Sequence, residues 1–117
     1  MTGSLTTHVL DTAAGRPAAG LRVELYRLDG DERVHIRTAV TNSDGRVDGQ
    51  MLTAGEFRRG TYEILFHAGE YHARAGGRSA EHSFLDVVPV RFGMDEQQHY
   101  HVPLLLSPFG YSTYRGS

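Results

Sequence analysis

The chain has 117 residues, enough for one domain, and its hydrophobic content of 39% is on the low side for a globular protein. Its formal net charge is −2 with scattered basic residues, which argues against nucleic-acid binding, and no apolar run approaches the ~20 residues that span a membrane. The absence of cysteine excludes disulfides, a thiolate nucleophile and a cysteine-based zinc site.

Alternation of apolar and polar residues, broken by turn residues, predicts about eight short strands. In chain order the expected strands are 5–10, 21–26, 34–39, 47–52, 62–67, 87–92, 99–106 and 110–115, and a loop is expected at 11–20. A short helix is expected at 70–75, ended by Gly76 and Gly77. Pro89 has no N–H to donate, which predicts an edge position or a bulge. Short strands separated by turns are typical of a sandwich or a barrel.

Histidines are the main candidates for chemistry, because the chain has seven and imidazole titrates near neutral pH. His99 and His101 are two residues apart on an expected strand, so both point the same way and could share a metal, but no third ligand is identifiable nearby. His8 lies on the first strand, where a hydrogen-bonded structural role is the ordinary explanation. Arg46 follows the strong turn 42–45, where a lone arginine is usually solvated. The terminal Ser117 offers a hydroxyl and a carboxylate.

Four segments carry a resemblance to a known family. They are Leu5-Thr6-Thr7-His8-Val9-Leu10-Asp11, Thr41-Asn42-Ser43-Asp44-Gly45-Arg46, the run from His99 to Pro108 and the run from Gly110 to Ser117. With these segments the chain resembles the 5-hydroxyisourate hydrolases, the enzymatic branch of the transthyretin-like family. The resemblance covers essentially the whole chain, and the ending Tyr114-Arg115-Gly116-Ser117 separates the enzymes from the hormone-carrying transthyretins.

The resemblance implies a fold and an assembly. The fold is an all-β, transthyretin-like sandwich of two four-stranded antiparallel sheets with one short helix, in a single domain over 1–117. The assembly is a homotetramer, a dimer of dimers, with active sites in clefts at the dimer–dimer interface. No secretory signal is recognised, so we expect a cytoplasmic location.

The resemblance also implies a reaction and a site. The reaction is the hydrolysis of 5-hydroxyisourate to 2-oxo-4-hydroxy-4-carboxy-5-ureidoimidazoline in urate catabolism, by attack of water on a ring amide, without cofactor or metal. The implied catalytic residues are His8, Arg46, His101 and Ser117, with Tyr114 and Arg46 contacting the substrate and His99 a bystander. We favour His8 as the base and His101 as its partner in proton transfer, although imidazoles in contact exchange these roles easily.

Three functions other than this hydrolysis remain as alternatives. A small-molecule carrier of the transthyretin type would need an apolar channel, whereas the expected cleft is lined by two histidines, an arginine and the serine ending. A zinc-dependent hydrolase would use His8, His99 and His101 as ligands, and its activity would not survive chelation. A plain interaction domain is disfavoured by the specific ending.

Overall fold

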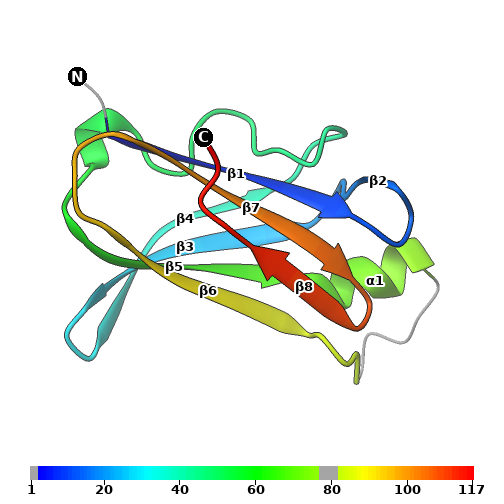
Figure 1. The fold of residues 1–117 in the computed structure, drawn as a ribbon. Helices are drawn as coiled ribbons and strands as arrows, with labels where there is room; N and C mark the ends of the chain where they lie inside the picture. Colours follow the sequence, from blue (N-terminus) through cyan, green and yellow to red (C-terminus); the bar gives the residue numbers. More distant parts are fainter. Residues whose placement is uncertain (1–2, 77–81) are drawn as a thin grey trace.

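Two four-stranded sheets pack face to face in the computed structural model, which describes residues 3–76 and 82–117 (Figure 1). The first sheet has the strand order β2-β1-β7-β8 and the second β4-β3-β5-β6. The strands are β1 (Ser4–Asp11), β2 (Arg16–Pro17), β3 (Arg22–Asp29), β4 (Glu32–Val40), β5 (Gly60–His67), β6 (Val87–Met94), β7 (His99–Ser107) and β8 (Gly110–Thr113). A 3₁₀ turn, η1 (Ala54–Glu56), and one helix, α1 (Ala68–Gly76), complete the described part of the chain. The expected transthyretin-like sandwich is confirmed.

One pairing differs from the expected antiparallel sheets. Strands β1 and β7 run parallel, with Thr6 opposite His101 and His8 opposite Pro103, so the first sheet is mixed. A hairpin joins only antiparallel strands, whereas parallel strands need a long crossover connection. Here the chain builds the whole second sheet between β1 and β7, and it therefore returns in the same direction.

Two short segments differ from the expectation: one expected strand is absent, and one expected loop contains a strand. The expected strand 47–52 is not a strand, because Gly49 bends the backbone at a φ of +77°, and only isolated bridges join the flanking Arg46 and Leu52 to β1. The expected loop 11–20 contains β2, which pairs antiparallel with the end of β1. Pro89 lies on β6 at the edge of its sheet, as predicted.

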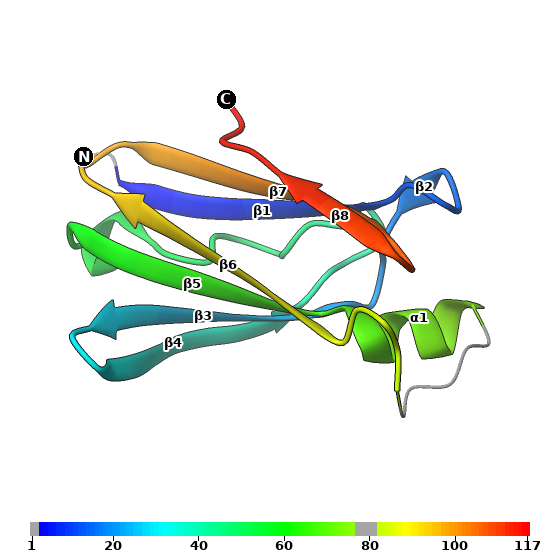
Figure 2. The ribbon, with the colours of Figure 1, turned by 60° about the horizontal axis from the view of Figure 1, so that its bottom comes forward.

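The two sheets form two layers (Figure 2), and the core lies between them. Alternation along each strand decides which side chains enter the core. On β1 the buried side chains include Leu5 and Val9, and on β7 they include Leu104 and Leu106. Burying one such aliphatic side chain contributes about 1.5–3 kcal/mol. The alternate residues of β1 and β7 therefore face outward, and His8 is among them.

Helix α1 lies at the end of the sandwich where β1 and β7 finish (Figure 1). The Tyr71 hydroxyl donates to the Asp11 carboxylate at 2.6 Å, and His72 Nε2 donates to the Ser107 carbonyl oxygen at 3.2 Å. Gly77, expected to help end the helix, lies outside the described residues. Within the described part of the chain, neither α1 nor any other helix has the length and apolarity to cross a bilayer.

Candidate active site

The turn at 42–46 is built by one asparagine side chain. Asn42 Oδ1 accepts hydrogen bonds from the backbone N–H of Asp44 at 2.8 Å and of Arg46 at 3.2 Å. Gly45 has a φ of +75°, and a Cβ there would lie 2.3 Å from the carbonyl oxygen of Val9. Only glycine therefore lets the turn pack directly on β1.

This turn brings Arg46 beside His8. The two residues form an isolated antiparallel bridge, so the arginine emerges next to the outward face of β1. His8 Nε2 donates to the Asp44 carbonyl oxygen at 2.8 Å, which leaves Nδ1 as the nitrogen with a free lone pair. The turn thus fixes both the position of the guanidinium-bearing residue and the tautomer of the imidazole.

His101 joins the same face from β7. Its Nδ1 is 2.8 Å from Thr6 Oγ1, because the parallel register places these residues opposite each other. The C-terminal segment continues the β7–β8 register beyond β8: Gly116 forms a bridge with His101, and its N–H donates to the His101 carbonyl oxygen at 2.8 Å. A Cβ on Gly116 would lie 2.5 Å from His101 Cδ2, so the tail packs closely against the imidazole.

The surroundings of His101 favour its neutral form. Burial is the largest cause that lowers its pKa from the ordinary 6.5, and the positive charge of Arg46 and the nearby His8 and His99 lower this pKa further. A backbone hydrogen bond at Thr6 acts in the opposite direction but is outweighed. Near neutral pH, His101 is therefore an unprotonated imidazole able to accept a proton.

The C-terminal residues border this cluster. Ser117 is exposed and follows directly after the Gly116–His101 contact. Tyr114 is also exposed, and it lines a surface cavity of about 390 Å³ together with Arg115, Tyr100 and residues of β6. The Arg115 guanidinium lies 4.3 Å from the centre of the Tyr100 ring. This cavity opens along β6 and the inward side of β7, so it is separate from the outward face with His8 and His101.

The structure thus brings three of the residues singled out from the sequence, His8, Arg46 and His101, onto one outward face. It adds two that the sequence did not single out. Thr6 contacts His101, and its spacing of two residues from His8 was the available signal. Gly116 packs on the same imidazole, which no local pattern indicates.

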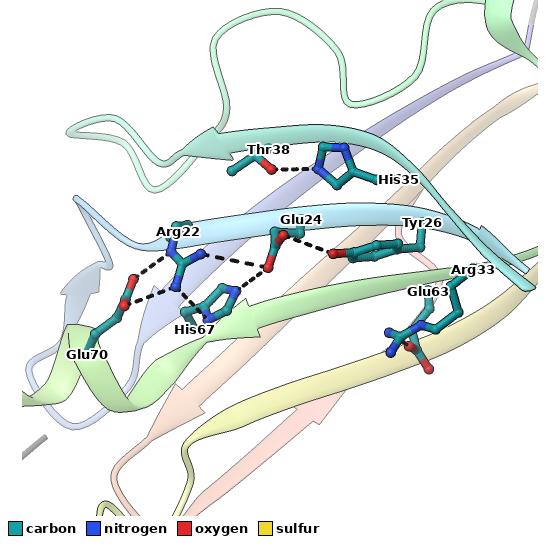
Figure 3. Close-up of polar contacts among 9 residues, drawn as sticks. All are labelled: Arg22, Glu24, Tyr26, Arg33, His35, Thr38, Glu63, His67 and Glu70. Atoms are coloured by element: carbon teal, nitrogen blue, oxygen red, sulfur yellow. Dashed lines mark hydrogen bonds and ion pairs between the residues drawn. The ribbon is translucent and has the colours of Figure 1, made fainter. Parts of the chain in front are cut away.

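A second group of ionisable side chains lies on the outward face of the other sheet (Figure 3). Arg22 donates to Glu70 at 3.0 and 3.2 Å, and His67 Nε2 donates to Glu24 at 2.6 Å. The hydrogen bond from His67 is the main cause that holds the pKa of Glu24 below its usual value. Because these charges are paired with one another, the group joins β3, β5 and α1 and leaves its carboxylates already satisfied.

The side chains of the described residues offer no arrangement suited to a metal ion. Over 3–76 and 82–117, no three His, Asp or Glu side chains come together in an arrangement that could hold a metal ion. The histidines proposed as zinc ligands use ring nitrogens in hydrogen bonds instead. His99 contacts Ser4 and Thr6, His101 contacts Thr6, and His8 contacts the Asp44 carbonyl.

Comparison with known sequences gives one consistent group of relatives. A family model described as HIUase/Transthyretin family matches residues 5–116. The 5-hydroxyisourate hydrolase 2 of Rhizobium meliloti is 63% identical over 116 residues, covering 98% of this chain and 97% of that protein. The 5-hydroxyisourate hydrolase of Mesorhizobium japonicum is 62% identical over 115 residues, covering 98% and 93%.

Solved structures of similar fold include two enzymes and a transthyretin in complex with thyroxine. An (S)-allantoin synthase superposes with a TM-score of 0.90 and 48% identity over 99% of this chain, which spans 44% of that protein. The 5-hydroxyisourate hydrolase of Klebsiella pneumoniae gives a TM-score of 0.83 with 36% identity, covering 98% and 99%. Sea bream transthyretin in complex with thyroxine gives 0.86 with 28% identity, covering 97% and 94%.

Proposed function

The chain belongs to the HIUase/Transthyretin family, and from this premise we propose that it is an enzyme that hydrolyses 5-hydroxyisourate. The observation that carries the proposal is the meeting of two histidines and an arginine on one face, in a chain whose relatives at 62 and 63% identity bear that enzyme's name. The product is 2-oxo-4-hydroxy-4-carboxy-5-ureidoimidazoline, an intermediate of urate catabolism.

Hydrolysis of the ring amide needs three contributions. The water oxygen bonds to the ring carbonyl carbon, the C–N bond breaks, one water proton goes to the leaving nitrogen, and the new carboxylic acid ionises. The site must therefore take a proton from water, stabilise the developing oxyanion and return a proton to nitrogen. Positioned acids and bases contribute typically about 10²–10⁴-fold each, and fixed cations stabilise the oxyanion.

We assign the proton acceptor to His101, which reverses the preference drawn from the sequence. Its lowered pKa keeps it unprotonated, and the Thr6 contact leaves Nε2 open to the attacking water. His8 then acts as the partner in proton transfer: its Nδ1 lone pair takes the remaining proton of the attacking water from the tetrahedral intermediate and passes it to the leaving nitrogen. Its Nε2 is already engaged with the turn, so Nδ1 is the atom available for this transfer.

The remaining site residues hold the substrate. Arg46 is permanently cationic and its planar guanidinium suits the oxyanion or the urea-like edge of the substrate. Ser117 orients the water or an imidazole from the end of the tail, and Tyr114 shapes the wall. The role of Ser117 is supported by its place directly after Gly116, which bridges to His101. The role of Tyr114 rests on the family resemblance, because in this structure Tyr114 lines the neighbouring cavity.

We propose further that the enzyme is a homotetramer, a dimer of dimers. The face that carries His8 and His101 is the outer surface of a sheet, and an amide hydrolase gains from excluding bulk water around its charges. A second copy laid on this face would supply the missing wall. Light scattering during size-exclusion chromatography measures the mass directly. The single domain over 1–117 and the cytoplasmic location stay predictions.

The carrier and zinc alternatives are not favoured. The transthyretin carrier is 28% identical to this chain, whereas curated relatives at 62 and 63% identity are named as hydrolases. A zinc enzyme would need His8, His99 and His101 as ligands, but His99 Nδ1 is hydrogen-bonded to Ser4 Oγ at 2.8 Å and His8 Nε2 to a carbonyl.

The test is direct. 5-Hydroxyisourate made freshly from urate by an oxidase is followed by its ultraviolet absorbance, with chelator present, with and without the protein. The wild-type protein should speed the decay, and His8→Asn and His101→Asn should each lower kcat at least ~100-fold while remaining folded. Decay at the spontaneous rate with folded wild-type protein would refute the proposed function. Activity above a tenth of wild type in both variants would refute the two-histidine scheme.

A further inference from the structure

Four outward side chains of β1 and β7 form a continuous chain of hydrogen bonds that ends at His101. His101 Nδ1 is 2.8 Å from Thr6 Oγ1, which is 3.3 Å from His99 Nε2, and His99 Nδ1 is 2.8 Å from Ser4 Oγ. The parallel register produces this order, because it places Ser4 opposite His99 and Thr6 opposite His101. A histidine set aside in the sequence as a bystander is thus linked to the site.

These bonds can run in one consistent direction, which starts from the tautomer that the reaction needs. For Nε2 of His101 to accept the proton of water, the ring N–H lies on Nδ1, which faces Thr6 Oγ1 at 2.8 Å. Nδ1–H of His101 then donates to Thr6 Oγ1, and the Thr6 hydroxyl donates onward to His99 Nε2. The remaining N–H of His99 donates to Ser4 Oγ. Each ring nitrogen in the chain has one role, and His101 Nε2 is left as a free lone pair.

We propose, on the basis of the hydrolase function above, that Thr6 is a positioning residue that holds His101 in the Nδ1–H tautomer. We propose also that Thr6 and His99 relay a proton from His101 to solvent. In the relay, Nε2 of His101 gains a proton while Nδ1 passes one to Thr6 Oγ1, whose own proton moves to His99 Nε2. His99 Nδ1 then releases a proton outward, and exchange with solvent at Nε2 of His101 and at His99 returns both rings to their starting tautomers before the next turnover.

The chemistry gives this relay a task. Opening the ring amide produces a carboxylic acid, which is ionised at neutral pH, and the leaving ureido nitrogen stays neutral. One proton must therefore leave the site in every turnover. His99 is exposed whereas His101 is half-buried, so the chain leads from the covered imidazole to one in contact with water.

The charged and titratable groups around His101 support an exit in this direction. They are Arg46 from the turn, His8 from β1 and His99 from β7. Burial and then the positive charge of Arg46 oppose a lasting charge on His101. A proton taken up there is therefore held weakly, and Thr6 is the hydrogen-bond partner that links His101 to another base.

Nuclear magnetic resonance tests the positioning role without using activity. In the wild-type protein above pH 7.5, the ¹⁵N shifts of His101 should show a protonated Nδ1 and an unprotonated Nε2. Thr6→Val removes the hydroxyl with little change of shape and should give a mixture of tautomers, whereas Thr6→Ser should keep the wild-type shifts. An unprotonated Nδ1 in the wild type, or unchanged shifts in Thr6→Val, would overturn the assignment.

Kinetics test the relay. Thr6→Val should lower kcat at least ~10-fold and change KM less. The expected loss is smaller than the roughly 10⁴-fold that a wholly wrong tautomer can cause, because only part of the population would change tautomer. Thr6→Ser should stay within about threefold of wild type. His99→Gln should lower kcat, and added imidazole buffer should restore it by accepting the proton. The matched control is Thr12→Val, which also removes a threonine hydroxyl, in this case one that donates to the carbonyl of Leu106 on β7, and it should behave as wild type.

The outcomes separate the two levels of the proposal. An inactive wild-type protein with the expected His101 tautomer would refute the hydrolase function and leave the positioning role of Thr6 standing. An active wild type in which His99→Gln keeps full kcat in dilute non-imidazole buffer would refute the relay.

Discussion

Replacing Gly116 with alanine would test whether the C-terminal tail positions His101. The added Cβ would lie 2.5 Å from Cδ2 of the imidazole and 3.2 Å from Cγ. Carbon atoms in contact are ordinarily about 3.5–4.0 Å apart, so the ring must retreat by roughly 1 Å or the tail must lift. The φ of Gly116 is not among the positive values, and the backbone itself accepts alanine.

The size of the effect follows from that displacement. A misplacement of about 1 Å at a reacting group costs on the order of 10²-fold in rate. Stability should change little, because Gly116 lies in the tail beyond β8 and its N–H can still bond the His101 carbonyl. We therefore expect Gly116→Ala to lower kcat about 100-fold while its unfolding midpoint stays near that of wild type.

The assay is the decay of 5-hydroxyisourate, run beside urea denaturation. Gly55→Ala is the matched control, because a Cβ at Gly55 meets no heavy atom within 4 Å and its φ is not positive. This control should keep wild-type kcat. A Gly116→Ala protein within about threefold of wild-type kcat would show that the tail does not position the imidazole.

Two further predictions concern pH. Because burial and then the charge of Arg46 lower the pKa of His101, its titration midpoint should lie below 6.5. The value of kcat/KM should fall as the pH drops through that midpoint, so an NMR titration and a pH–rate profile should agree. A midpoint above 6.5 would contradict the assignment of His101 as the base. Burial alone would raise the pKa of Asp11, but hydrogen bonds, first of all from Tyr71, lower it below 3.8. The stability Asp11 contributes is therefore present above 3.8 and lost as pH falls through the lowered value. Tyr71→Phe should reduce the free energy of unfolding by about 1–3 kcal/mol at pH 7 and by less at pH 2, as measured in urea, and an equal loss at both would contradict this linkage.

Local patterns in the sequence predict most of the strands but not how they pair. Alternation placed β1, β3, β5, β6 and β7 within a few residues, and Pro89 marked an edge strand. Strand direction depends on the path of the whole chain, so the parallel pairing of β1 with β7 has no local signal. The two-residue strand β2 is too short to alternate and was expected to be part of a loop.

The candidate site was predicted in its residues and only partly in its geometry. His8, Arg46 and His101 were singled out by motif, and the structure places them on one face. Thr6 and His99 were undervalued, because their importance comes from a contact across the parallel pair. A hydrogen bond between residues distant in sequence is invisible to any reading of neighbours along the chain.

The parallel pairing of β1 with β7 also sets when the site can exist during synthesis. Thr6 and His101 are 95 residues apart, and at about 5–20 residues per second a ribosome needs roughly 5–20 s to add that length. During this interval one edge of β1 can pair with β2 and bridge to Arg46 and Leu52, but the edge that β7 will occupy is open to other chains. Such distant pairings also fold slowly. A nascent chain that stops before β7 therefore exposes the unpaired edge of β1 and lacks His101, the proton acceptor. Catalysis can begin only once β7 has covered the edge that favours aggregation.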